Sequence, residues 1–297
     1  MDENTLLIKD DKLTYIKQTF SGFKKNEVTK QIYTSIEKQN VQASLYWCAE
    51  SVASGYFLEL WDIIIKIYCF NIHTANPKLP LYLYFRYNEF KTIINNTPDN
   101  NEIDLRNNTQ IRRIFSEIVI ILCTSTRKYS IQRINIGKND VEHSYIQTHI
   151  RAPDTTFINC FDKEDPTEIF IIINELCYLF KEQNIHRITF WIEWLLLYEK
   201  KFKLKMKCKK RFEDIIQPKH QCDVIWLIWE IILHNTTCVG QKQIIQSLFS
   251  LFSIRYSKPL RAKRIIVLYV AIKFLFIDNL KLNTPLYTDK TLINICY

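Results

Sequence analysis

The sequence predicts an all-α protein made of two tandem helical bundles, and two observations support this prediction. Only 4 of its 297 residues are glycine, whereas barrels, sandwiches and nucleotide-binding folds use glycine in tight turns and phosphate loops. Apolar residues also recur at helical spacing along most of the chain. The length allows one large core or two smaller ones.

The expected helices follow from apolar spacing and from the residues that end helices. In the first half they span 26–39, 41–54, 56–71, 81–95 and 109–126, with a polar loop at 96–108. In the second half they span 166–181, 184–206, 222–235, 240–254 and 261–280. The stretch 128–153 lacks helical periodicity and alternates briefly, which favours an irregular linker or a short strand. We therefore expect one domain at 1–150, linker included, and a second at 151–297.

Short sequence matches between the halves favour a duplication. The matches are Gln-Asn-Val at 39–41 with Gln-Asn-Ile at 183–185, Tyr-Trp at 46–47 with Phe-Trp at 190–191, and Arg-Arg-Ile-Phe at 112–115 with Lys-Arg-Ile-Ile at 263–266. Two related bundles, roughly 20–140 and 155–285, would place Trp47 and Trp191 at equivalent buried positions. Chance similarity between amphipathic helices rich in Ile and Lys is the alternative.

The helix expected at 41–54 carries small residues beside large aromatic ones. The small residues are Ala43, Ser44, Ala49, Ser51, Ala53 and Ser54. A neighbouring helix can approach closely along such a face. It would come from the same bundle or from a partner, which can be a second copy of the chain or another protein.

The stretch IYTSIEKQNVQASLYWCAE, residues 32–50, resembles part of the helical C-terminal region of clamp-loader-like AAA+ ATPases of the MgsA type. Ala43, Leu45, Tyr46 and Trp47 fit the Ala-Leu-Tyr-Trp helix of that region, with Ser44 interrupting it. Residues 112–130, RRIFSEIVIILCTSTRKYS, are similar to a later helix. The resemblance covers about a third of the chain and implies an oligomerising helical collar. The ATPase module is absent, and Ser-Gly-Tyr-Phe replaces the turn that the family has after the Trp helix.

A second resemblance concerns FWIEWLLLYEKKFK at 190–203, which looks like helical proteins of nucleocytoplasmic large DNA viruses. The abundance of Asn, Ile and Lys agrees with an AT-rich genome. This resemblance implies a viral setting in the host cytoplasm, the nucleus or the virion interior. Neither resemblance carries over a functional residue.

Several classes of function are disfavoured by what the sequence lacks. The four glycines stand far apart, so neither a Walker A loop nor a GxGxxG turn can form, and we expect no ATP hydrolysis, no cofactor and no catalytic residue. The nine cysteines are scattered, mostly within apolar runs, which favours a reducing, intracellular compartment without disulfides. The polar N-terminus is unlike a signal peptide, and the apolar runs are too short or too charged to span a bilayer.

Three other groups of residues have weaker signals. A zinc site is one interpretation of Cys208, His220, Cys222, His234 and Cys238, but their spacing matches no standard zinc knuckle, and ordinary thiols are favoured. The six histidines are dispersed, and no local signature marks a Cys–His dyad.

Glu50 and Glu193 follow the two tryptophans. We expect each to pair with a basic residue of a later helix, and a general acid is the alternative. The basic residues in question are Arg112, Arg113, Lys263 and Arg264.

Charge is the strongest functional signal. The net charge is +9, and residues 199–211, EKKFKLKMKCKKR, hold eight basic residues and one acid. Helical spacing would gather Lys200, Lys203, Lys207 and Lys210 on one face, although lysines also solvate helix ends. The predicted nucleic-acid contacts are Lys200, Lys201, Lys203, Lys205, Lys207, Lys209, Lys210 and Arg211, with Arg112, Arg113, Lys263 and Arg264 if exposed. The sequence thus favours a non-enzymatic, nucleic-acid-associated accessory protein of viral replication or transcription. A scaffold or virion protein without a nucleic-acid role is the alternative.

Overall fold

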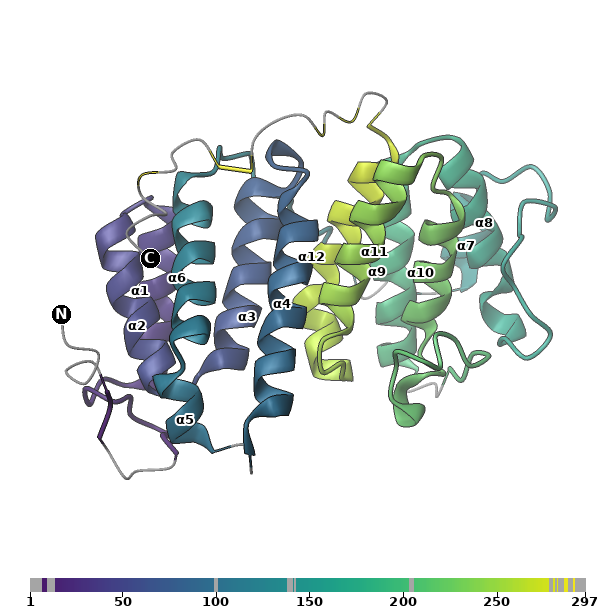
Figure 1. The fold of residues 1–297 in the computed structure, drawn as a ribbon. Coiled ribbons are helices and arrows are strands. Elements are labelled where there is room, and N and C mark those ends of the chain that lie inside the picture. The colour runs from purple at the N-terminus through teal and green to yellow at the C-terminus, as the bar shows by residue number, and fades with distance from the viewer. Residues whose placement is uncertain are drawn as a thin grey trace. The chain divides into compact units, whose positions relative to one another are not determined.

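The fold is all-α, as the sequence predicted. The computed structural model describes residues 7–9, 14–98, 101–137, 141, 143–202, 206–277, 280, 282, 286, 287 and 291. These residues form twelve α-helices and no strand, and an isolated bridge joins Gln18 to Lys24 (Figure 1). Among them, no helix combines the length and the apolar character that crossing a membrane requires.

The chain divides into two compact units. Unit 1 comprises Met1–Ser130 and Lys281–Tyr297, and unit 2 comprises Ile131–Leu280. The division falls inside 128–153, the stretch predicted to be a linker. Most of that stretch belongs to unit 2, because the Arg133 guanidinium and the Tyr145 ring both contact the helix that carries Trp191.

Unit 1 is built around a cluster of aromatic rings. Its helices are α1 (Lys25–Glu37), α2 (Val41–Ala53), α3 (Phe57–Ile67), α4 (Leu79–Asn96), α5 (Glu102–Asn107) and α6 (Thr109–Thr124). Trp61 of α3 is fully buried, and its ring centroid lies 5.5 Å from that of Phe115 of α6 and 6.0 Å from that of Phe90 of α4. These contacts hold α3, α4 and α6 together. α2 packs against α1 and α6 (Figure 1).

Ser44, one of the small residues of α2, faces α6 of the same unit, while Ala49 is exposed. Ser44, Cys48 and Ser51 are buried, and the Cys123 thiol of α6 lies 3.3 Å from the Ser44 hydroxyl. The aromatic pair of α2 is less covered: Trp47 is half-buried and Tyr46 is 53% exposed. The prediction that Trp47 and Trp191 occupy equivalent buried positions is therefore wrong for Trp47.

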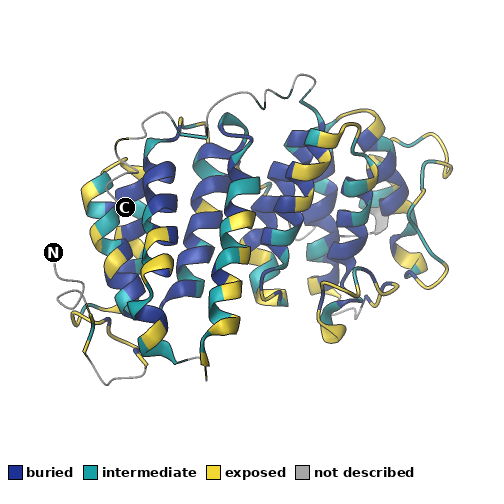
Figure 2. Cartoon of the chain, viewed as in Figure 1, coloured by how far each residue is buried: buried dark blue, intermediate teal, exposed yellow. Residues whose placement is uncertain are grey.

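Unit 2 has a larger buried aromatic core. Its helices are α7 (His143–His149), α8 (Phe170–Lys181), α9 (Ile185–Lys201), α10 (Val224–His234), α11 (Val239–Ser253) and α12 (Lys258–Leu275). Four tryptophans are 0% exposed, two on α9 and two on α10: Trp191, Trp194, Trp226 and Trp229. Buried residues line the inward faces of the helices of each unit (Figure 2).

The Gln-Asn matches of the two halves form the same turn. Gln39 and Gln183 both adopt left-handed backbone conformations, with φ of 59° and 55°. Each Asn side chain then caps the next helix: Asn40 accepts from Ala43 N at 3.0 Å, and Asn184 accepts from Arg187 N at 3.2 Å. The two turns are therefore alike in structure as well as in sequence. Superposition of the complete units stays a prediction.

The structure departs from the expected helices at four places, one of which is the end of α12 at Leu275 instead of 280. α5 lies in the region expected to be a polar loop, and α7 lies in the region expected to lack helix. Both are short and begin at polar residues, so they lack an extended apolar stripe. α9 ends at Lys201 instead of continuing to 206. The described linker residues 126–137 form neither helix nor strand.

Candidate nucleic-acid interface

The basic segment 199–211 does not form one helical face. α9 ends at Lys201, Lys203 and Lys205 lie outside the described residues, and 206–211 are irregular. The helical spacing predicted for Lys200, Lys207 and Lys210 is therefore wrong, because these residues do not share a helix. Lys200, Lys207 and Lys210 are nevertheless exposed.

Other basic residues of this segment have structural roles. Arg211 is 6% exposed, and it donates to both Asp165 oxygens, at 2.8 and 2.7 Å, and to Glu230 at 2.5 Å. Lys209 Nζ lies 2.8 Å from an Asp162 oxygen. Lys201 donates to the carbonyl of Val141 at 3.0 Å. Arg211 is thus a buried ion-pair partner and presents no surface for a phosphate.

The four basic residues predicted outside the segment also include both exposed side chains and side chains with structural roles. Arg113 and Lys263 are exposed, in unit 1 and unit 2 respectively. Arg112 is half-buried and donates to the Arg106 carbonyl and the Asn107 side chain, both at 2.9 Å. Arg264 is buried and donates to the carbonyls of Phe252 and Ile254, which end α11. Arg264 therefore caps a helix.

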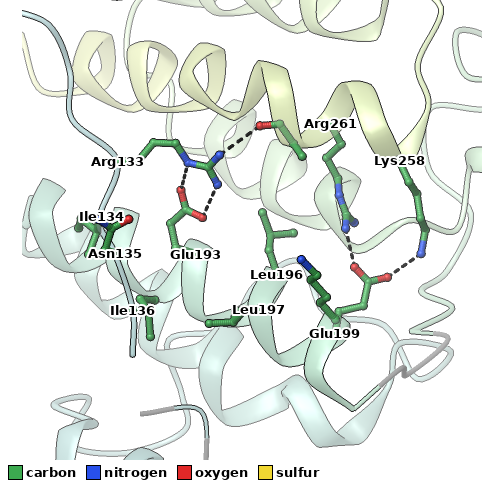
Figure 3. A pocket seen from close by; sticks show the side chains of 12 residues that line it. Arg133, Ile134, Asn135, Ile136, Glu193, Leu196, Leu197, Glu199, Lys258 and Arg261 are labelled. Atoms are coloured by element: carbon green, nitrogen blue, oxygen red, sulfur yellow. Dashed lines mark hydrogen bonds and ion pairs between the residues drawn. The ribbon is translucent and has the colours of Figure 1, made fainter. Parts of the chain in front are cut away.

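A pocket of about 880 Å³ in unit 2 brings several basic side chains together (Figure 3). We call it the basic pocket. It is bounded by α9, by the first turns of α12 and by the irregular segment 133–136. Its lining residues are Arg133, Ile134, Asn135, Ile136, Glu193, Leu196, Leu197, Glu199, Lys200, Lys258, Arg261 and Ala262.

Glu193 anchors one end of the basic pocket. Arg133 donates to both Glu193 oxygens at 2.7 Å, and the Tyr269 hydroxyl of α12 also hydrogen-bonds Glu193. The hydrogen bonds to Glu193 raise the pKa of Arg133. The prediction that Glu193 pairs with Lys263 or Arg264 was wrong, since its cation comes from the linker. Glu50, in unit 1, was also expected to pair with an arginine, and instead it accepts from Ser21 N at 2.8 Å and from the Ser21 hydroxyl at 2.6 Å.

Glu199 anchors the other end. Lys258 Nζ lies 2.7 Å and Arg261 lies 2.6 Å from its two oxygens (Figure 3). Arg261 also donates to Asp223 at 2.6 Å. Burial opposes the charge of Arg261, but Asp223 and Glu199 outweigh it and raise the pKa of Arg261. The guanidinium is therefore fixed in place and always charged.

The pocket keeps a surplus of positive charge. Four lining residues are cationic and two are anionic, which leaves a formal +2 before the adjacent Asp223 is counted. Lys200 is exposed and has no partner among the described residues. Lys258 keeps 57% of its side chain exposed despite its ion pair. Both amines can therefore reach an anion in solution.

Of the four cations that line the pocket, Lys200 was predicted from the sequence, and Arg133, Lys258 and Arg261 were not. One signal was present in the sequence: Lys258 and Arg261 flank Pro259 at a helix start, where the helix dipole favours acids. Basic residues there need carboxylate partners, and Glu199 and Asp223 supply them. No sequence pattern distinguished Arg133, because the stretch 128–153 around it has no helical periodicity.

The residues considered for zinc do not converge. Among the described residues, no three His, Cys, Asp or Glu side chains lie close enough to hold a metal ion. Cys208 and Cys222 are neighbours through a backbone hydrogen bond of 3.0 Å, while His234 and Cys238 are exposed at the two ends of the turn after α10. The cysteines in the described part of the chain are all free thiols. Burial raises the pKa of the Cys208 thiol to about 12.

Comparisons of the chain with known protein families, with curated proteins and with solved structures find no match.

Proposed function

We propose that this chain is a non-enzymatic, nucleic-acid-associated accessory protein that binds phosphate backbone through the basic pocket. The observation that supports this most is the exposed pair Lys200 and Lys258, held beside Arg133 and Arg261 in one concave site. Lysine and arginine side chains neutralise phosphates without reading sequence. The composition and the viral resemblance support a role in the replication or transcription of a large DNA virus.

Arg133 and Arg261 contribute two positive charges at fixed positions in the pocket. Each guanidinium is held by a carboxylate, so it is already in place before a ligand binds. Lys200 and Lys258 can then supply the mobile contacts. Binding by a few such contacts would be weak at physiological salt and would strengthen as salt is lowered.

A matched pair of lysine variants tests the proposal. Lys200 and Lys210 are both exposed and belong to the same basic segment, but only Lys200 lines the basic pocket. In fluorescence anisotropy titrations with a labelled oligonucleotide, Lys200→Gln should weaken binding and flatten the log–log salt slope by roughly 0.7–0.9. Lys210→Gln should change neither. Equal effects of both variants would favour the whole segment as the interface, and no binding at low salt would refute the proposal.

The second candidate function is a scaffold, and exposed aromatic side chains favour it. Tyr46 on α2 is 53% exposed and Phe85 on α4 is 65% exposed. A partner, including a second copy of the chain, could cover these rings. Such an apolar interface would persist as salt rises, whereas phosphate binding would not.

A further inference from the structure

We infer that the basic pocket takes single-stranded nucleic acid in preference to a duplex; this inference rests on the function proposed above. Carbon side chains of Ile134, Leu196 and Leu197 line the pocket together with the cations, and Leu196 lies between Arg133 and Arg261 (Figure 3). A ligand that fits must therefore offer apolar surface close to its phosphates.

The two forms of nucleic acid differ in this respect. A duplex presents phosphates on its outer surface and keeps its base faces stacked inside, so it can reach Lys200 and Lys258 but cannot cover the apolar lining. A single strand exposes base faces next to its phosphates, and proteins bind such strands by combining a basic groove with contacts to base faces. The pocket contains no aromatic ring, so aliphatic contact would replace stacking.

The polar groups of segment 133–136 give a second argument. Asn135 is exposed, and its amide has both donors and an acceptor. No backbone hydrogen bond between described residues involves 134–136. The free edges of unpaired bases can satisfy these groups, whereas the paired edges in a duplex are already engaged. Charge, apolar lining and the polar groups of 134–136, which have no backbone hydrogen bond to other described residues, thus all favour a single strand.

The test compares one labelled strand with the blunt duplex formed from the same sequence, at equal low salt, by fluorescence anisotropy. The wild type should bind the single strand about tenfold more tightly. Leu197→Asn should weaken single-strand binding about tenfold and duplex binding less than twofold, because it removes apolar surface and no charge. Ile215→Asn is the matched control, since Ile215 is 58% exposed outside the pocket, and it should change neither affinity.

Leu197 lies inside α9, so a second variant guards against a folding defect. Ile134 lies in the irregular segment, and Ile134→Asn should reproduce the selective loss of single-strand affinity while the circular dichroism spectrum stays that of the wild type. Lys200→Gln should lower the affinity for the single strand and the affinity for the duplex by similar factors.

The outcomes separate this inference from the proposed function. Equal affinity for strand and duplex, with both weakened by Lys200→Gln, overturns the single-strand inference and leaves the proposed function standing. A single-strand preference unchanged by Leu197→Asn and Ile134→Asn also overturns the inference. Polyglutamate of matched length competing as well as the single strand would show that only charge is recognised. Absence of binding to either nucleic acid at low salt would end both proposals.

Discussion

The turns before α2 and before α9 are built alike, but the tryptophans that follow them are buried to different extents. In both turns the third residue after the helix donates to a carbonyl five residues back: Asn40 N to Ser35 O at 3.0 Å, and Asn184 N to Leu179 O at 3.1 Å. This is the hydrogen bond of a Schellman motif. Trp191 is nevertheless 0% exposed, whereas Trp47 is half-buried.

The difference comes from what covers each ring. Trp191 contacts Tyr145 of α7, with ring centroids 6.5 Å apart, and Trp194 at 5.6 Å. Trp47 contacts Phe23 at 5.3 Å and the exposed Tyr46 at 5.0 Å. The short helix α7, from the linker, thus covers Trp191. No described helix of unit 1 covers Trp47 in the same way. Matching local sequence therefore specifies a turn and leaves the degree of burial to the rest of the unit.

The largest effect should follow loss of the better-covered ring. Trp191→Ala should lower the free energy of unfolding by about 3–5 kcal/mol, because it leaves a cavity among buried side chains. Urea unfolding followed by far-UV circular dichroism measures this, and hydrogen exchange can assign the loss to unit 2. Destabilisation below about 1 kcal/mol would contradict the burial of Trp191 and remove the contrast between the units.

Trp47→Ala should cost less. A half-buried ring removes less apolar area from water, so the expected loss is about 1–2 kcal/mol. The same urea experiment applies, with exchange followed in α1, α2 and α6. A loss equal to that of Trp191→Ala would mean that the two tryptophans are equivalent, as the sequence repeat first predicted.

Local chemistry explains which parts of the fold were predictable. Apolar spacing located the long helices within a few residues, and the Asn caps marked the starts of α2 and α9. α5 and α7 were missed because short polar helices depend on their surroundings for stability. The end of α9 was missed because the lysines after it are good helix formers.

The candidate site was less predictable than the fold, because ion pairs distant in sequence decide which charges are free. Arg211 looked like one more surface cation in a lysine-rich run, but Asp165 draws it into the interior. Arg133 looked like part of a linker, but Glu193 fixes it at the basic pocket. No local pattern encodes such partners. Lys200 was predictable because no carboxylate among the described residues pairs with it.

The shared caps should give matched effects of intermediate size. Asn40→Ala and Asn184→Ala each remove a side-chain acceptor from a helix start, and each should cost about 1 kcal/mol. Urea unfolding of the two single variants measures this, with Asn→Asp as the conservative control that keeps the acceptor. Clearly unequal losses would indicate that the two turns, despite their equal geometry, do not contribute equally.

The smallest effect should come from the left-handed glutamines, and it should differ between the units. Glycine adopts positive φ without the steric cost that other residues bear, so Gln183→Gly should stabilise unit 2 by about 0.5 kcal/mol. Gln39→Gly removes the same steric cost of a positive φ. It also removes the hydrogen bond from Gln39 Nε2 to the Cys123 carbonyl, which is 3.0 Å long. Because such a bond contributes about 0.5–1.5 kcal/mol, the net change in unit 1 should be near zero or destabilising. The shift of the urea unfolding midpoint relative to the wild type measures each change. Gln183→Ala is the control: alanine bears the same steric cost at positive φ, so this variant should not be more stable than the wild type. Equal stabilisation by the two glycine variants would show that the Gln39 hydrogen bond contributes nothing, and the two turns would then be equivalent in energy as well as in geometry.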